Sequence, residues 1–273
     1  MKKLLKGLAV FALVIFLAAC SGDAGGDKKD GYYQAANNQN GEWTNFMTFE
    51  VKDGKIDSVD YNSVNLRKGE VALKKEQAKD GKYVMNGKSG KEWHEQAKLV
   101  EDYIIEHQNL DGIKFDDEGN DADGVTGATI HIADTKKLLD DALEAGPVEK
   151  GDMKDGIYYD KAKADEKGYV YTLGYYVKDG HILAVTADAF GTKGDEKDKF
   201  KSDLAKDGKY DLGEDAVGSY DKQAIAFDDY LIKNQGLPDL KLDKEGKTDA
   251  ISGATITVKP WVDLYDKLSK ESK

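Results

Sequence analysis

Two copies of one short motif carry the residues best suited to chemistry. Asp123-Gly124-Val125-Thr126-Gly127-Ala128-Thr129 recurs as Asp249-Ala250-Ile251-Ser252-Gly253-Ala254-Thr255. A Gly-Ala pair flanked by hydroxyl residues favours a compact turn that leaves the last threonine hydroxyl exposed. The amides at the start of a following helix favour a phosphate group. We therefore interpret Thr129 and Thr255 as attachment points for a phosphate-linked cofactor.

Chance explains one such match more easily than two. Average residue usage supplies a Ser/Thr-Gly-Ala-Thr string in about one chain of this length in a hundred. Two copies in the same place of a repeat, each ahead of a helical pattern, are much rarer. The alternative is an unmodified turn that a duplicated ancestor left in both halves.

The two motifs occupy matching places in a long internal repeat. Lys52-Asp53-Gly54 matches Lys178-Asp179-Gly180, and Gln96-Ala97 matches Gln223-Ala224, at a nearly constant offset. This period is far longer than the ~20–50 residues of solenoid repeats. We predict two tandem domains, residues 30–147 and 148–273, with Pro147 marking the boundary.

Each repeat predicts an α+β domain. Residues 43–51 and 169–177 are rich in aromatic and β-branched side chains and run into Lys-Asp-Gly turns, which predicts antiparallel hairpins. Apolar residues at helical spacing predict a helix before each motif, from Trp93 and from Tyr220. A second helix follows each motif, ending at Gly146 in the first repeat and opening with Pro260 at its first position in the second.

The N-terminus resembles a bacterial lipoprotein signal. A basic start and an apolar stretch precede Leu17-Ala18-Ala19-Cys20, which resembles a lipobox. We predict a signal peptide over 1–19, lipidation of Cys20, and a flexible tether over 20–29. Two acyl chains anchor a protein far better than one, so we expect a lipid-anchored protein on the extracytoplasmic face of the cell membrane. An ordinary secretory signal is the alternative.

Composition excludes other classes of function. The formal net charge of −12, with Lys interspersed among Asp, argues against nucleic-acid binding. Cys20 is the single cysteine, so we expect no disulfide, no catalytic thiol and no covalent c-type haem. The histidines have no metal-binding spacing and no histidine counterparts in the other repeat, so we expect no metal site. These four residues are His94, His107, His131 and His181.

The paired motifs resemble the flavinylation motif of the FMN-binding domain family, of the NqrC and RnfG type. That family includes subunits of membrane redox complexes and Gram-positive extracellular lipoproteins. The resemblance implies that FMN is covalently attached to Thr129 and Thr255 through phosphoester bonds. It also implies a separate Mg-requiring flavin transferase that uses FAD. The surrounding recognition elements would be Asp123, Gly124, Thr126, Gly127, Ala128, Asp249, Ser252, Gly253 and Ala254.

The function that the resemblance implies is electron transfer. A two-domain flavin lipoprotein of this kind passes electrons from a membrane dehydrogenase and quinone chain to extracellular acceptors such as ferric iron. The flavin supplies the chemistry, so such a protein is a redox carrier before it is an enzyme such as a ferric reductase. The alternatives are an unmodified solute-binding or surface-interaction lipoprotein, and an additional signalling role for the released signal fragment.

Aromatic residues that recur in both repeats are candidates for contact with a flavin ring, although most are expected to be core residues. The pairs are Tyr33 and Tyr158, Tyr83 and Tyr210, Trp93 and Tyr220, and Tyr103 and Tyr230.

Overall fold

The computed structural model describes residues 28–38, 41–67, 71–85, 90–115, 121–214, 216–238 and 240–273. The predicted signal peptide, Cys20 and the tether up to residue 27 lie outside these ranges. Among the helices of the described residues, none has both the length and the apolar character needed to cross a membrane.

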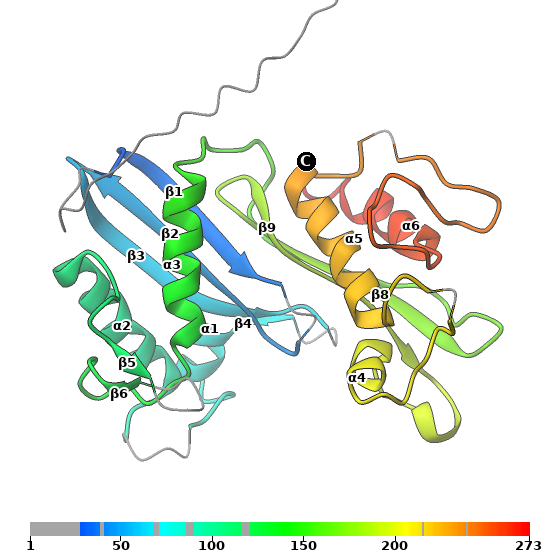
Figure 1. The fold of residues 1–273 in the computed structure, drawn as a ribbon, viewed down its shortest axis with the longest axis horizontal. Helices are drawn as coiled ribbons and strands as arrows, with labels where there is room; N and C mark the ends of the chain where they lie inside the picture. Colours follow the sequence, from blue (N-terminus) through cyan, green and yellow to red (C-terminus); the bar gives the residue numbers. More distant parts are fainter. Residues whose placement is uncertain are drawn as a thin grey trace, which may run out of the picture.

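The described residues form two antiparallel sheets of four and three strands, with helices packed on them. The first sheet has the order β1-β2-β3-β4 and the second β7-β8-β9 (Figure 1). The strands are β1 (Gly31–Asn37), β2 (Thr44–Lys52), β3 (Lys55–Asn65), β4 (Ala72–Leu73), β7 (Gly156–Lys161), β8 (Tyr169–Lys178) and β9 (His181–Gly191). The α+β prediction is confirmed at this level.

The predicted hairpins are confirmed in both halves. Asp53 and Gly54 have φ angles of 51° and 73°, and Asp179 and Gly180 have φ angles of 50° and 79°. Two consecutive residues with positive φ are typical of the tight hairpin turn that matches the twist of the strands. The Lys-Asp-Gly sequences therefore fix the register of β2 on β3 and of β8 on β9.

Three helices follow each sheet, in the same order. They are α1 (Lys74–Lys79), α2 (Trp93–His107) and α3 (Ala133–Ala145), and then α4 (Lys201–Lys206), α5 (Tyr220–Asn234) and α6 (Lys259–Leu268). A 3-10 turn lies at Gly194–Glu196, and a two-stranded ribbon joins β5 (Lys114–Phe115) to β6 (Asp121–Asp123). The four predicted helices are present; α6 begins at Lys259, so Pro260 takes its second position rather than the first.

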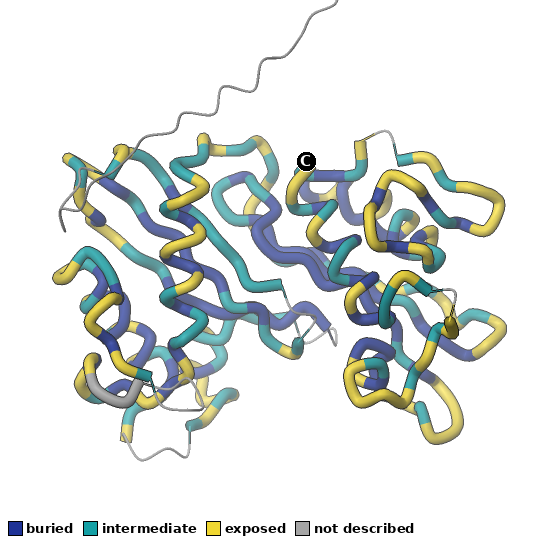
Figure 2. The backbone as a smooth tube through the Cα atoms, in the orientation of Figure 1, coloured by how far each residue is buried: buried dark blue, intermediate teal, exposed yellow. Residues whose placement is uncertain are grey.

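Each half buries its own apolar core (Figure 2). Helix α2 packs on β3 and α3 on β1 and β2, while α5 packs on β9 and α6 on β8. The helices present apolar faces because their buried residues recur every three or four positions. We call residues 30–147 the first unit and residues 148–273 the second unit.

The ends of α2 and α5 are tied to the sheets by the same device. Gln108 and Gln235 follow the two helices in the left-handed region, with φ angles of 65° and 53°. The Gln108 side chain accepts from the Ile56 amide at 2.7 Å and donates to the Ile56 carbonyl at 3.0 Å. Gln235 makes the same pair of bonds with Ile182, at 2.6 and 3.0 Å. The repeat therefore extends to partly buried polar contacts.

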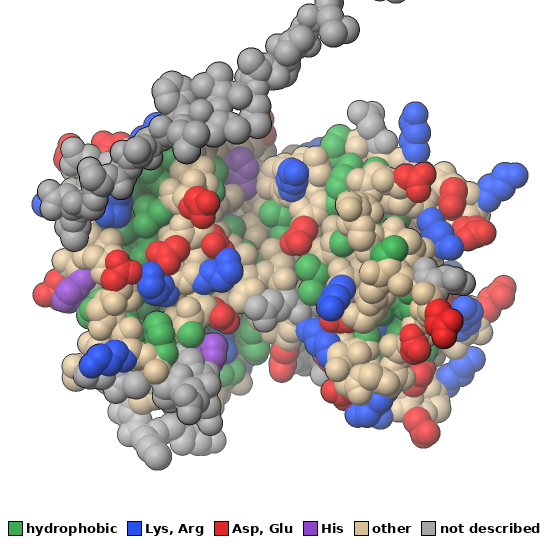
Figure 3. All heavy atoms as spheres, viewed as in Figure 1, with side chains coloured by type: hydrophobic (Ala, Val, Ile, Leu, Met, Phe, Trp, Pro, Cys, Tyr) green, Lys and Arg blue, Asp and Glu red, His purple; other side chains and the backbone are tan. Residues whose placement is uncertain are grey.

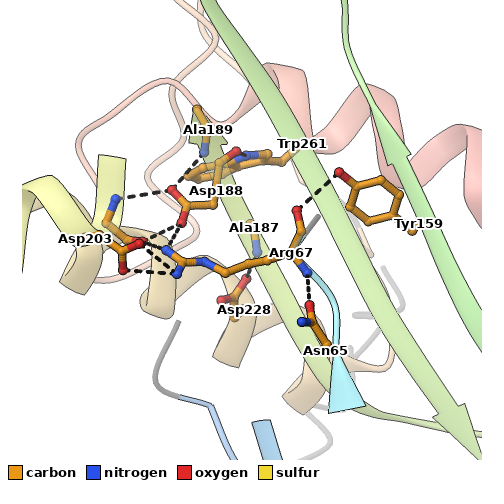
Figure 4. Close-up of polar contacts among 10 residues, drawn as sticks. Asn65, Arg67, Tyr159, Ala187, Asp188, Ala189, Asp203, Asp228 and Trp261 are labelled. Atoms are coloured by element: carbon orange, nitrogen blue, oxygen red, sulfur yellow. Dashed lines mark hydrogen bonds and ion pairs between the residues drawn. The ribbon is translucent and has the colours of Figure 1, made fainter. Parts of the chain in front are cut away.

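The contacts between the two units include a small apolar cluster and one arginine. The cluster joins Phe46, Val64 and Leu66 to residues of β8 and β9, with the Phe46 and Tyr176 rings 5.2 Å apart. Arg67, just after β3, reaches into the second unit (Figure 4). The two sheets are thus held side by side (Figure 1).

Arg67 makes charged contacts with the second unit. Its Nη2 lies 2.7 Å from the Asp188 carboxylate and also donates to Ser202, and its Nη1 lies 3.0 Å from Asp203. The side chains of Arg67 and Asp188 are 5% and 0% exposed, so this ion pair is buried. The Phe200 ring packs against the guanidinium, and its ring centroid lies 4.3 Å from the Arg67 Cζ atom.

Candidate functional site

The two motif segments form equivalent turns. The Ala128 amide donates to the Val125 carbonyl at 3.0 Å, and the Ala254 amide donates to the Ile251 carbonyl at 3.2 Å. Gly127 and Gly253 take the third turn position with φ angles of 89° and 88°. Positive φ at this position favours glycine over any residue with a Cβ atom. The Gly in each Gly-Ala pair is therefore needed for the shape of the turn.

The turn separates buried anchors from an exposed hydroxyl. The apolar residue before the turn and the alanine inside it are buried in both units: Val125 and Ala128, Ile251 and Ala254. Thr129 and Thr255 are exposed, as predicted for sites that a second protein must reach. Thr126 and Ser252, which precede the glycines, are also exposed. The two threonines therefore have matching surroundings.

A buried glutamine holds each threonine in place. The Oε1 atom of Gln96 accepts hydrogen bonds from the Thr129 amide at 2.6 Å and from its hydroxyl at 3.2 Å. Gln223 makes the same two bonds to Thr255, at 2.6 and 3.2 Å. Both glutamines are 0% exposed and lie in the helix before the motif. The sequence contains these glutamines as a repeated pair, but their contact with the threonines was not predicted.

The glutamines are oriented by a second bond. Gln96 Nε2 donates to the Lys91 carbonyl, and Gln223 Nε2 donates to the Gly218 carbonyl, both at 2.9 Å. This bond fixes which end of the amide faces the motif, so Oε1 serves as the acceptor. The threonine hydroxyl donates its proton and keeps its lone pairs for another partner. A neutral amide is no base, so Gln96 and Gln223 orient the hydroxyls without taking their protons.

The other predicted recognition residues lie around the turns. Asp123 is the last residue of β6 and pairs with Lys114 of β5. A Cβ atom on Gly124 would lie 3.0 Å from the Ile113 side chain, so this position favours glycine. Asp249 is exposed and follows the buried Thr248, whose hydroxyl accepts from the Ala250 amide at 3.2 Å. The two aspartates therefore lie at the entry to their turns.

The following helices start at the same step in both units. Helix α3 begins at Ala133 and α6 at Lys259, each four positions after its threonine. The side chains of the residues before them, Ile132 and Val258, make no capping bond, although their carbonyls accept from the Thr135 and Trp261 amides at 2.9 and 3.0 Å. This arrangement is compatible with a phosphate on the threonine.

Each unit also holds a lysine among aromatic rings, which the sequence interpretation did not identify. Lys74 Nζ lies 4.5 Å from the Tyr83 ring centroid and 5.1 Å from those of Trp43 and Trp93. Burial lowers the pKa of Lys74 to about 8. Two of the predicted aromatic candidates, Tyr83 and Trp93, therefore face a cation.

The second unit repeats this lysine with more rings. Lys201 Nζ lies 3.7 Å from the Tyr169 centroid, 5.0 Å from that of Tyr210, and 5.3 Å from those of Tyr171 and Tyr220. Burial lowers the pKa of Lys201 to about 8 as well. We call Lys201 with these four tyrosines the tyrosine box. A buried amine with a lowered pKa marks a candidate functional site when a cavity adjoins it.

The remaining aromatic candidates have structural partners. Tyr33 stacks on Phe49 with ring centroids 4.8 Å apart, and Tyr158 packs on Tyr175 at 5.1 Å. Tyr103 stacks on His107 at 4.0 Å, and the Tyr230 hydroxyl donates to the Pro238 carbonyl at 3.4 Å. Each of the four residues therefore has a ring or hydrogen-bond partner within the protein.

The charged residues do not gather into a metal centre in the part of the chain that the structure describes: no group of three or more His, Cys, Asp or Glu side chains there could hold an ion. On the face in Figure 3, acidic and basic side chains are interspersed over both units.

No protein-family model matches the chain, and no curated protein matches it. Similar solved structures come from two clostridia. A solution NMR structure from Clostridium thermocellum is 38% identical over 43% of this chain and 91% of that chain, with a TM-score of 0.33. A crystal structure from Clostridium perfringens is 30% identical over 43% of this chain and 88% of that chain, with a TM-score of 0.33. Neither name states an activity or a ligand, and likeness at this score supports no functional conclusion.

Proposed function

We propose that this protein is a membrane-anchored extracellular electron carrier with two tandem FMN-binding domains. FMN is attached covalently to Thr129 and Thr255, and Cys20 carries the lipid anchor. Electrons pass from a membrane dehydrogenase and quinone chain through the flavins to an extracellular acceptor such as ferric iron. The resemblance of the two motifs to the family's flavinylation motif is the source of this proposal.

The duplicated threonine geometry is the observation that supports it best. In both units a glycine-dependent turn presents an exposed threonine hydroxyl, which a buried glutamine orients through its Oε1 atom. A solute pocket needs no exposed hydroxyl held in the same way twice. An acceptor for a modifying enzyme needs one, because the enzyme must reach the oxygen and find it in a fixed position.

The attachment step balances with FAD as the donor. The threonine oxygen forms a bond to the phosphorus of the FMN half, the pyrophosphate bond breaks, and AMP leaves with the bridging oxygen. The hydroxyl proton must be taken up by a base. Gln96 and Gln223 are neutral amides, so in this proposal the flavin transferase supplies the base along with Mg²⁺.

The test is the mass of the protein purified in detergent from cells with and without a flavin transferase, followed by peptide mapping. We expect two added FMN groups, on Thr129 and Thr255, only with the transferase. The Thr129→Ala and Thr255→Ala single variants should each carry one, and the double variant none. A protein without added mass in transferase-containing cells refutes the proposal and favours the solute-binding alternative. Flavin retained by the double variant places the link elsewhere.

A further inference from the structure

A cavity of about 430 Å³ lies beside the motif of the second unit. Its wall includes Ile256 and Thr257, the two residues that directly follow Thr255. Lys201 and three rings of the tyrosine box line it as well, namely Tyr171, Tyr210 and Tyr220. This volume lies within the roughly 300–1,000 Å³ of small-molecule sites. The cavity thus extends from the two residues after Thr255 to the aromatic cluster.

The cavity contains polar groups without protein partners. Tyr220 is 3% exposed, and its hydroxyl makes no hydrogen bond among the described residues. Leaving such a hydroxyl buried and unpaired costs about 1–3 kcal/mol. The Lys201 amine faces ring centroids, with no acceptor bonded to it in the described part of the chain. The Tyr220 hydroxyl is itself buried, so a ligand with a flat apolar body and a polar acceptor would pack against the rings and bond to the Lys201 amine.

The carboxylates around Lys201 do not fully compensate its positive charge. Desolvation is the largest influence on its pKa and lowers it, and Lys167 acts in the same direction. Asp165, Asp188 and Glu196 oppose the shift without cancelling it. Asp188 is paired with Arg67, and Glu196 accepts from the Tyr169 hydroxyl. Asp165 accepts from the Tyr169 amide at 2.8 Å, so these three carboxylates have other partners, and Asp165 and Glu166 also line the cavity. An anion in the cavity would therefore stabilise the charged form of Lys201.

We propose that this cavity receives the isoalloxazine ring of the flavin attached to Thr255, and that Lys201 compensates the negative charge of the reduced ring. This inference rests on the proposed function and deepens it. A flavin ring held there would gain a negative charge on taking up two electrons and one proton from solvent, and the Lys201 amine would lie close enough to compensate it. The electrons come from an external donor, which is an electrode in the test below. Lys201 is a positioning residue, because it neither accepts nor donates the electrons.

The experiment uses Thr129→Ala protein made with the transferase, so that only Thr255 carries flavin. Peptide mapping first verifies the single attachment, and its absence would refute the proposed function, not the role of Lys201. Lys201→Met is then added and the midpoint potential measured by spectroelectrochemistry. We expect the equilibrium constant for reduction to fall about tenfold, which is about 30 mV for a two-electron couple. An unchanged potential at full attachment overturns the inference.

Lys233→Met is the matched control. It removes the same charge from an exposed position near the end of α5, roughly 20 Å along the helix from Tyr220. At that separation salt screens the charge, so the potential should not change. An equal fall in this variant would mean that net charge, not Lys201, sets the potential.

A second measurement avoids the risk that Lys201→Met does not fold. Lysine side chains in Thr129→Ala protein are followed by NMR across pH, and the Lys201 signal is identified by its loss in Lys201→Arg. We expect the apparent pKa of about 8 in the flavin-free protein to rise when the flavin is attached and reduced. A Lys201 titration that is identical with and without reduced flavin overturns the inference.

Discussion

The two units share the same fold but place different side chains at one buried polar position, which is Asn62 on β3 in the first unit and Asp188 on β9 in the second. In the first unit the Asn62 side chain accepts amide bonds from the next residue at 2.8 Å and from α1 at 3.1 Å. In the second unit Asp188 accepts the equivalent bonds at 2.8 Å and 3.3 Å from α4. The same backbone site therefore holds a neutral amide once and a carboxylate once.

At a second pair of positions, both units bury a carboxylate, but only the first unit pairs it with a cation. Helix α2 sends Glu101 to the β3 backbone at 2.8 Å, and α5 sends Asp228 to the β9 backbone at 2.9 Å. Lys75 of α1 forms an ion pair with Glu101. Ser202 takes the place of that lysine in α4, so Asp228 has no cation of this kind, and its Oδ2 atom has no partner among the described residues.

The two units therefore differ in where the cation for a buried carboxylate comes from. The second unit contains the buried Asp188, whose cation Arg67 comes from the first unit (Figure 4). The first unit neutralises its own buried carboxylate with its own Lys75. A buried carboxylate that loses its cation is strongly destabilising. We infer that the second unit depends on the first, while the first depends much less on the second.

The largest expected effect comes from Arg67→Met. We expect it to lower the free energy of unfolding of the second unit by about 3–5 kcal/mol, because it leaves Asp188 buried without its cation. Denaturant unfolding followed by fluorescence can report each unit, since Trp261 lies in the second and Trp43 and Trp93 lie in the first. A Trp43→Phe, Trp93→Phe background isolates the Trp261 signal.

Asp188→Asn is the matched rescue. In the Arg67→Met background it should recover most of the lost stability, because Asn62 satisfies the equivalent amides in the first unit with a neutral side chain. The double-mutant cycle then gives the coupling energy of the pair. A Trp261 transition that Arg67→Met leaves in place would contradict the dependence of one unit on the other.

A smaller effect is expected when the motif anchor is removed in one unit only. Gln223→Leu keeps the side-chain size but leaves the Thr255 and Ile256 amides without the acceptor that now lies 2.6 and 3.1 Å away. Each lost partner costs about 1–3 kcal/mol. We expect hydrogen exchange at Thr255 to quicken at least about tenfold while Thr129 is unaffected, and Gln96→Leu should do the reverse. Equal protection of the Thr255 amide from exchange in parent and variant would mean that the turn is stable without the glutamine.

Flavin attachment should follow the same unit-specific pattern. If the glutamine orients the hydroxyl for the transferase, Gln223→Leu lowers occupancy at Thr255 and spares Thr129. Gln223→Glu keeps an acceptor but loses the donor that bonds to the Gly218 carbonyl at 2.9 Å. It should therefore retain more occupancy than Gln223→Leu in peptide mapping. Altered exchange without altered occupancy would limit the glutamine to a structural role.

The pH dependence of stability should differ between the units because of Asp228. Burial raises the pKa of Asp228 well above its ordinary value. The folded state then binds more protons than the unfolded state, so stability falls as pH rises from the unfolded pKa of about 3.9 to the folded pKa. The slope is at most about 1.4 kcal/mol per pH unit. Asp228→Asn should reduce the slope and stabilise the second unit at neutral pH; part of the slope should remain, because burial also raises the pKa of Asp188 and of Asp229.

Glu101→Gln is the counterpart in the first unit. Burial raises the pKa of Glu101 too, but Lys75 opposes that shift, and the substitution removes one member of this ion pair. We expect no gain in stability from it, measured by the tryptophans of the first unit at neutral pH. A gain as large as that of Asp228→Asn would show that Lys75 does not compensate Glu101.

The sequence predicted the elements that depend on local patterns, namely the hairpins and the four longer helices. The Lys-Asp-Gly turns and alternating strands gave the hairpins, and helical spacing gave α2, α3, α5 and α6. Helices α1 and α4 were missed because six residues are too few for a period to appear. The exposed threonines followed from the Gly-Ala turn, which is also a local feature.

Contacts between residues far apart in the sequence could not be predicted from local patterns. Arg67 lies 121 positions from Asp188 and has no equivalent partner within the repeat, so no spacing indicated this pair. Gln96 and Gln223 recur in register, but a buried glutamine in a helix has no local signature until the segment 33 or 32 positions away packs on it. Comparing polar residues retained in both repeats was the one signal that pointed to them.

The smallest expected effect concerns the second charged link between the units, and it separates buried from exposed contributions. Lys178 Nζ lies 3.4 Å from Asp60, with side chains 27% and 37% exposed. Burial raises the pKa of Asp60, but Lys75 and Lys178 outweigh it and the pKa is lowered. Lys178→Ala leaves Asp60 its other cation, Lys75, at 2.7 Å. We expect a loss below about 1 kcal/mol that shrinks further with added salt. A loss equal to that of Arg67→Met would locate the coupling of the units in exposed charges and refute the dependence on Arg67.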